Sequence, residues 1–211
     1  RAGGMELFSN CLKVNGYLEY QEDGNYDLND DTIDSTTGKK YSEFKNKKEF
    51  NPATYILITG GSEESDELPE EKQKIIREVF NSSENKFGKN IKIVLGTRVM
   101  NEGVTLKNIR EIHILDVHYN LGKVEQVIGR GIRMCKHLEL ITDDNPDPKV
   151  NVYRYVASLK NKLSSDEELY KKAELKYLLV KETEELLKKA AIDCPLLYHG
   201  NHFPEEVEKY K

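Results

Sequence analysis

The stretch Tyr55-Ile-Leu-Ile-Thr59, closed by Gly60-Gly61, is the part of the sequence that decides the fold class. A short apolar run that ends in glycines is typical of a buried β-strand. Similar runs recur at residues 91–95, 112–115 and 152–156, and helical periodicity fills residues 70–80 and 124–134 between them. Apolar strands that alternate with helices favour an α/β fold, in which a mainly parallel sheet carries helices on both faces.

The segment before this core divides into three parts. Residues 7–16 are periodic enough for a short helix, and Tyr17 to Tyr20 predicts a strand. Residues 21–50 then read as a polar insertion that is acidic at its start and basic at its end. Such a composition buries little apolar surface, so we expect a mobile surface loop. A contact between its basic end and phosphates is the alternative.

The segment after the core predicts a long helix. Ser165 followed by Glu168 has the spacing of a capping box, and apolar residues recur from there to about Ile192. One helix, or two in succession, would be about 40 Å long in all, which is too long for one more element of a compact sheet domain. We therefore expect two domains, residues 1–160 and a helical extension over residues 161–211.

Composition narrows the class of protein. The 211 residues include 32 basic and 37 acidic ones, so a nucleic-acid partner would need a local basic stripe. No apolar run approaches the roughly 20 residues that span a bilayer. The three cysteines are odd in number and lack CxxC spacing, which predicts a reducing, cytoplasmic setting and no metal site. His199 and His202, near Cys194, read as plain loop residues. The absence of a signal peptide and of an initiating Met suggests a piece of a longer chain.

The most specific signal is Gln126-Val-Ile-Gly-Arg130-Gly-Ile-Arg133. On a helix, Gln126, Arg130 and Arg133 fall within roughly 60° of arc. The opposite side carries a set of apolar residues that would anchor the helix: Val124, Val127, Ile128, Ile132 and Cys135.

Two guanidinium groups on one helix face suit an anion between them, because the planar Arg fork matches phosphate oxygens. Gly129 and Gly131 each destabilise a helix by about 1 kcal/mol relative to alanine. Two such costs in one helix suggest that another group approaches the backbone there. The alternative is a solvated basic face that carries two arginines by chance.

These residues resemble the superfamily 2 helicases, whose sixth motif reads QxxGRxxR. The fifth motif of that family is matched by Gly96-Thr-Arg-Val-Met-Asn-Glu-Gly103-Val-Thr-Leu106, directly after an apolar strand. The stretches at residues 101–107 and 119–133, with Ala-Ile-Asp-Cys at 191–194, are similar to transcription helicases of large DNA viruses. Among these are the poxvirus early transcription factor small subunit and nucleoside triphosphate phosphohydrolase I, with giant-virus relatives. Swi2/Snf2 translocases are similar more distantly.

The resemblance implies a second RecA-like domain of an ATP-dependent helicase or translocase, with a role in viral transcription in a cytoplasmic viral factory or virion. It implies that Arg133 is the arginine finger and that Arg130 holds the γ-phosphate or its neighbour. Gln126 would orient the nucleotide or link the two lobes. Gly103 and Glu102 would lie at the nucleotide. Thr105 replaces an acidic residue that is common in related motifs. The nucleic-acid track would be lined by Gly60, Gly96, Thr97 and Arg98, with DNA favoured over RNA.

Two parts of an ATPase site do not occur as motifs: a phosphate-binding loop with Lys and a carboxylate for Mg²⁺. Thr37-Gly-Lys-Lys40 lacks the first glycine and the final Ser or Thr of that loop, and Asp66-Glu-Leu-Pro69 follows no buried strand. We therefore expect ATP and Mg²⁺ to be bound mainly by a preceding RecA-like lobe, so that this chain alone is inactive. The alternative is a catalytically inert protein- or DNA-binding module. The long helix suggests docking to a viral RNA polymerase or another transcription factor.

Overall fold

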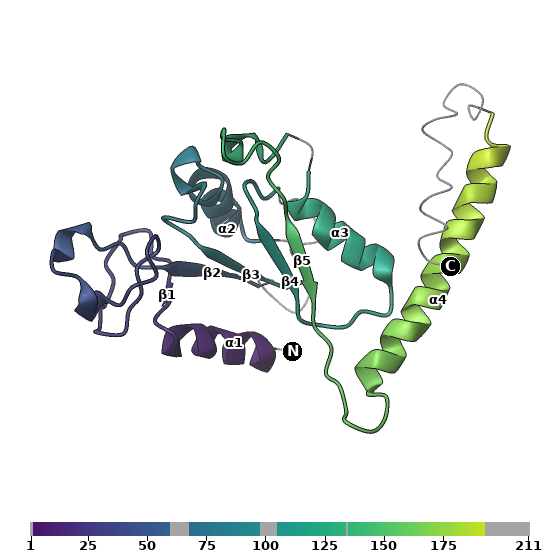
Figure 1. Cartoon of the computed structure of the whole chain (residues 1–211), viewed down its shortest axis with the longest axis horizontal. Helices are drawn as coiled ribbons and strands as arrows, with labels where there is room; N and C mark the ends of the chain where they lie inside the picture. Colours follow the sequence, from purple (N-terminus) through teal and green to yellow (C-terminus); the bar gives the residue numbers. More distant parts are fainter. Residues whose placement is uncertain (1, 60–67, 98–104, 134, 193–211) are drawn as a thin grey trace. The chain divides into compact units, whose positions relative to one another are not determined.

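The computed structural model describes residues 2–59, 68–97, 105–133 and 135–192. The chain divides into two compact units (Figure 1). The first unit comprises residues 1–110 and 129–150, and the second comprises residues 111–128 and 151–211.

A parallel sheet forms the centre of the first unit. Its strands are β1 (Leu18–Glu19), β2 (Thr54–Ile58) and β3 (Ile93–Gly96), in that spatial order. Tyr55 is in register with Ile93, and Ile58 is in register with Gly96. The α/β class and the parallel strand direction predicted from the apolar runs are confirmed.

Helices cover both faces of this sheet (Figure 1). Ile56 and Ile58 point to one face, because side chains alternate along a strand, and they pack against α2 (Glu70–Ile75) and the π-helical turn Ile76–Phe80. Tyr55 points to the other face, where its hydroxyl lies 2.6 Å from the hydroxyl of Ser9 in α1 (Ala2–Val14). The core of the unit lies between β2 and α2.

The second unit has a parallel pair of strands and a helical core. β4 (Glu111–Ile114) pairs with β5 (Asn151–Arg154), separately from β1–β3, so the described residues form two sheets and not the single predicted one. The start of α3 (Leu121–Gly131) packs on α4 (Ser165–Ala190) through Leu121, Val124 and Ala173. Burial and the nearby Glu125 carboxylate, which accepts a hydrogen bond from Tyr177, raise the pKa of Tyr177 to about 12.

The long C-terminal helix is present, but its cap lies one residue earlier than predicted. Ser164 accepts a hydrogen bond from Glu167 N–H at 3.1 Å, and its own N–H donates to the Glu167 carboxylate at 2.6 Å. Ser164 has extended backbone angles and Ser165 is already helical, so the capping box is Ser164–Glu167. No described helix is long and apolar enough to cross a membrane. The division into residues 1–160 and 161–211 stays a prediction.

The polar insertion at residues 21–50 buries more than its composition predicts. Thr32, Asp34 and Ser35 are almost completely buried. Polar groups tolerate burial when they are hydrogen-bonded. Asp34 accepts bonds from the backbone N–H groups of Thr36, Thr37 and Asn51 and from the Thr37 hydroxyl. The expectation of an exposed segment therefore holds for most of residues 21–50 and fails at the turn around Asp34, where a buried carboxylate organises the backbone.

Gly16 fixes the place where this segment meets α1. Its φ is +84°, and a Cβ atom there would lie 2.2 Å from the carbonyl oxygen of Asp31. Only glycine combines that backbone conformation with so close an approach. Gly16 also accepts a hydrogen bond from Ile33 N–H at 3.0 Å.

Replacing Asp34 with alanine is expected to lower the free energy of unfolding by about 2 kcal/mol, because buried N–H donors lose a charged acceptor. Burial alone would raise the pKa of Asp34, but the hydrogen bonds from Asn51, Thr37 and Thr36 hold it below the usual value. The stabilisation is complete above the unfolded-state pKa of about 3.9 and is lost as the pH falls through the lower folded-state pKa. Urea unfolding from pH 3 to 7 measures this. If the difference in unfolding free energy between the wild type and Asp34→Ala stayed constant down to pH 3, this prediction would be contradicted.

Candidate functional site

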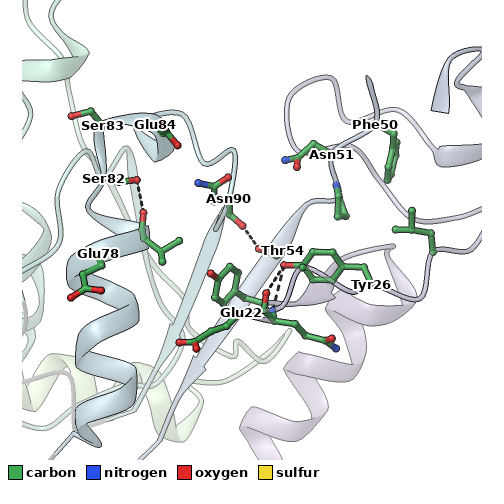
Figure 2. A pocket seen from close by; sticks show the side chains of 16 residues that line it. Glu22, Tyr26, Phe50, Asn51, Thr54, Glu78, Ser82, Ser83, Glu84 and Asn90 are labelled. Atoms are coloured by element: carbon green, nitrogen blue, oxygen red, sulfur yellow. Dashed lines mark hydrogen bonds between the residues drawn. The ribbon is translucent and has the colours of Figure 1, made fainter. Parts of the chain in front are cut away.

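One hollow of the first unit does not suit phosphates. Figure 2 shows this pocket, of about 910 Å³, which lies beside β2 and the turn after α2. Its walls carry three glutamates, Glu22, Glu78 and Glu84, and its 16 lining residues include neither lysine nor arginine. None of the predicted site residues lines it. The candidate site is therefore elsewhere in the unit.

Arg133 lies just beyond α3, which ends at Gly131 and not at the predicted Met134. Its side chain folds back onto the end of the helix. The Arg133 Nε donates to the carbonyl oxygen of Gly129 at 3.2 Å, and Nη1 donates to the hydroxyl oxygen of Thr105 at 2.9 Å. The guanidinium is therefore fixed at two points of the first unit.

The predicted apolar face of α3 is correct only in part. Val124 is buried and Ile128 packs beside it, as predicted. Val127, Ile132 and Cys135 are exposed. The prediction for Ile132 and Cys135 was wrong because the helix has already ended, so the spacing of 100° per residue does not extend to them.

Two chain segments meet beside Arg133. The Leu106 N–H donates to the carbonyl oxygen of Arg130 at 3.3 Å, and the Asn108 N–H donates to that of Lys136 at 3.1 Å. The Asn108 side chain also donates to the Glu139 carboxylate at 3.0 Å. Residues 105–108, which begin at the end of the fifth motif, are thereby held along residues 130–139, which begin in the sixth motif.

Asn81 holds the first of these segments on its other side. Its amide nitrogen donates to the carbonyl oxygen of Thr105, and its amide oxygen accepts from Lys107 N–H, both at 2.8 Å. A side chain that accepts and donates in this way pairs with the backbone as a neighbouring strand would. Asn81 directly follows the π-helical turn, and its own N–H donates to Ile76.

Backbone strain gathers in the same two segments. Asn108 has φ +57° and Cys135 has φ +62°, and these are the non-glycine residues with positive φ in the described part of the chain. Each such conformation costs on the order of 1 kcal/mol and persists only where surrounding contacts impose it. Strain of this kind is typical of functional sites.

The carboxylate of Glu139 is a further hydrogen-bond acceptor beside these two segments. Hydrogen bonds from Asn108 and from the Ser83 hydroxyl hold the pKa of Glu139 below its usual value. The carboxylate is therefore ionised at neutral pH and ties residues 83 and 108 together. Asn81 and Glu139 were not predicted as members of this arrangement, because they lie outside the two motifs in sequence and match no spacing rule. Thr105 was placed in the fifth motif, but its contact with Arg133 was not predicted.

The remaining predicted residues of α3 are accessible to different degrees. Gln126 is exposed, in the part of α3 that belongs to the second unit, and Arg130 is half-buried in the first. A Cβ atom at Gly129 would meet no described atom within 4 Å, so the expected close approach to Gly129 stays a prediction about a group outside the described residues. Gly131 is buried, and the backbone contact nearby is made at Arg130.

The predicted nucleic-acid track begins at one edge of the sheet. Gly96 ends β3 opposite Ile58, and the Thr97 N–H donates to the carbonyl oxygen of Ile58 at 3.2 Å. Both residues therefore lie at the carboxyl ends of parallel strands, the edge where open α/β sheets bind ligands. Gly60, Arg98, Glu102 and Gly103 lie outside the described residues. Within the described part, no group of three or more His, Cys, Asp or Glu residues could hold a metal ion.

A comparison with protein families identifies the kind of domain that contains Arg133. Residues 32–135, which include residues 105–108 and Arg133, match the helicase conserved C-terminal domain. Residues 32–135 belong to the helicase C-terminal domain family. The RecA-like α/β fold expected from the two motifs is thereby confirmed for this helicase domain.

Relatives of this helicase domain occur in large DNA viruses. A protein of Acanthamoeba polyphaga mimivirus, named as an ATP-dependent RNA helicase, is 53% identical over 98% of this chain and 19% of its own length. A protein of Invertebrate iridescent virus 3, named as a helicase, is 30% identical over 95% of this chain and 18% of its own length.

Nucleoside triphosphatase I of Heliothis armigera entomopoxvirus is 31% identical over 61% of this chain and 19% of its own length. The chain thus spans about a fifth of the length of these relatives. The predicted resemblance to helicases of large DNA viruses is confirmed.

Proposed function

We propose that this domain is the C-terminal lobe of an ATP-dependent helicase or nucleic-acid translocase and that Arg133 is its arginine finger. The observation that supports this most is the fixed guanidinium of Arg133. Two of its five N–H groups are bonded, to Gly129 and Thr105, within the described residues. The other three have no partner among the described residues and could bind phosphate oxygens and stabilise the charge of the transition state for γ-phosphoryl transfer.

Arg130 and Gln126 are the other members of the proposed catalytic set. Arg130 lies in the last turn of α3, three residues before Arg133, and would hold the γ-phosphate. Gln126 would orient the nucleotide. Glu102 and Gly103 are proposed to lie at the nucleotide on the strength of the motif alone. Arginine suits this work because it stays charged and binds phosphate oxygens through two parallel bonds.

A second lobe must supply what this set lacks. Arginines fit the triphosphate of ATP, but Mg²⁺ needs carboxylate or hydroxyl oxygens, and the described residues include no acidic metal cluster. We propose that a preceding RecA-like lobe of the same protein binds most of ATP and Mg²⁺. Closure of the two lobes on ATP would then bring Arg133 to the γ-phosphate.

The nucleic acid is proposed to run past Gly60, Gly96, Thr97 and Arg98. The position of Gly96 and Thr97 at the carboxyl edge of β2 and β3 supports this. The mimivirus relative is named an RNA helicase, so the names of relatives do not favour DNA as the sequence analysis did. A role in viral transcription, in partnership with a viral RNA polymerase, remains a proposal that rests on the viral relatives.

ATP hydrolysis by the full-length protein tests the proposal. We expect single-stranded or duplex nucleic acid to stimulate hydrolysis, whereas residues 1–211 alone should hydrolyse no ATP. Parallel assays with RNA and DNA of the same sequence identify the strand that is used. Hydrolysis by residues 1–211 alone would refute the split site. A full-length protein that binds nucleic acid without hydrolysing ATP would instead favour the inert binding module.

A further inference from the structure

The Arg133 side chain needs support because it extends from a residue beyond the end of a helix. An arginine side chain has several rotatable bonds, and holding it in one conformation costs up to about 2 kcal/mol in entropy. An α3 that ended at Met134 would have carried Arg133 on its last turn. Since α3 ends at Gly131, other contacts must aim the guanidinium.

Thr105 supplies the contact at the tip of the side chain. The bond from Arg133 Nε to Gly129 joins residues four apart and restrains only the base of the guanidinium. The bond to the Thr105 hydroxyl, 28 residues away in sequence, restrains its far end. Two bonds from different nitrogens to different segments define the plane of the group.

Thr105 is itself held to the hydrophobic core. Its carbonyl oxygen accepts from Asn81, and the next residue, Leu106, is buried against Ile76 and Phe80. Asn81 follows the π-helical turn that contains both of those core residues. A continuous path therefore runs from the core through Asn81 and residues 105–107 to the tip of Arg133.

We propose that Thr105 is a positioning residue for Arg133 and that Asn81 anchors it, so that the fifth motif aims the arginine of the sixth. The proposal rests on the proposed function of Arg133 as an arginine finger. Thr105 touches no substrate in it and acts through the guanidinium alone. Thr105 stands where related motifs often have an acidic residue. A hydroxyl at this position accepts one hydrogen bond from the guanidinium without forming an ion pair with it.

Thr105→Val is the sharpest test, because valine keeps the branched shape and loses the hydroxyl. In the full-length protein we expect kcat for ATP hydrolysis to fall about tenfold, the loss of one hydrogen bond to a charged group, while the KM for ATP changes little. Thr105→Ser should restore most of kcat. In an Arg133→Ala background, Thr105→Val should have no further effect, because the residue that it positions is gone.

Two outcomes would overturn the inference and leave the proposed function intact. One is wild-type kcat in Thr105→Val while Arg133→Ala abolishes hydrolysis. The other is an equal loss from Thr105→Val with and without Arg133, which would mark a purely structural role. Thr105→Ala, checked for folding by circular dichroism, serves if the valine variant does not fold. Wild-type hydrolysis in Arg133→Ala would instead refute the proposed function itself, and the inference with it.

Discussion

Arg133→Ala is expected to lower kcat for ATP hydrolysis in the full-length protein by about 10³-fold or more, because an arginine finger contributes about 10³ to 10⁵. Most of ATP would be bound by the other lobe, so nucleotide affinity should change far less. Single-turnover hydrolysis together with titration of a fluorescent ATP analogue separates the two effects.

Arg77→Ala is the matched control for this experiment. Arg77 is an exposed arginine of the same unit, and its guanidinium contacts only the neighbouring Glu78 among the described residues. Its removal takes away the same charge without touching the 105–108 or 130–139 segments, so hydrolysis should stay at the wild-type rate. Equal losses in the two variants would show that Arg133 acts through net charge, and an unchanged rate in Arg133→Ala would point to the inert module.

Asn85→Ala should lower the free energy of unfolding by about 3 kcal/mol. The Asn85 side chain is buried and makes four hydrogen bonds. It donates to the carbonyl oxygens of Phe80 and Ile91 and accepts from the N–H groups of Asn90 and Ile91. Alanine would leave these groups without a partner where the helical segment turns into β3.

Chemical denaturation of residues 1–211 measures this effect. Asn10, which is exposed on α1, is the control, and its alanine variant should change stability by less than about 0.5 kcal/mol. Similar midpoints for Asn85→Ala and Asn10→Ala would mean that water replaces the lost bonds. β3 ends at Gly96, next to Thr97, and both residues belong to the proposed nucleic-acid track. If that proposal holds, a weaker β3 should also weaken nucleic-acid binding in the full-length protein.

The strands and helices were largely predictable because they depend on local periodicity. The run Tyr55–Thr59 became β2 to within one residue, and the pattern of residues 70–80 became α2 with its π-helical turn. The predicted ends of two helices were wrong. Ser164 caps α4 in place of Ser165, and α3 ends before Arg133, because neighbouring residues with equal propensity compete and packing decides between them.

By itself, the sequence determined the α/β class, the parallel strands and the two motifs that mark a helicase domain. These depend on residue types at short, regular spacing, and Arg133 could be singled out from the sequence for that reason. Only the tertiary structure decided how Arg133 is held: by the hydroxyl of Thr105 and, behind it, the amide of Asn81. It also decided that Asp34 is buried in a segment whose composition predicted exposure. The physical reason is the same in both cases. A hydrogen bond between distant residues depends on where the folded backbone brings a donor and an acceptor together, and no periodicity along the chain records that distance.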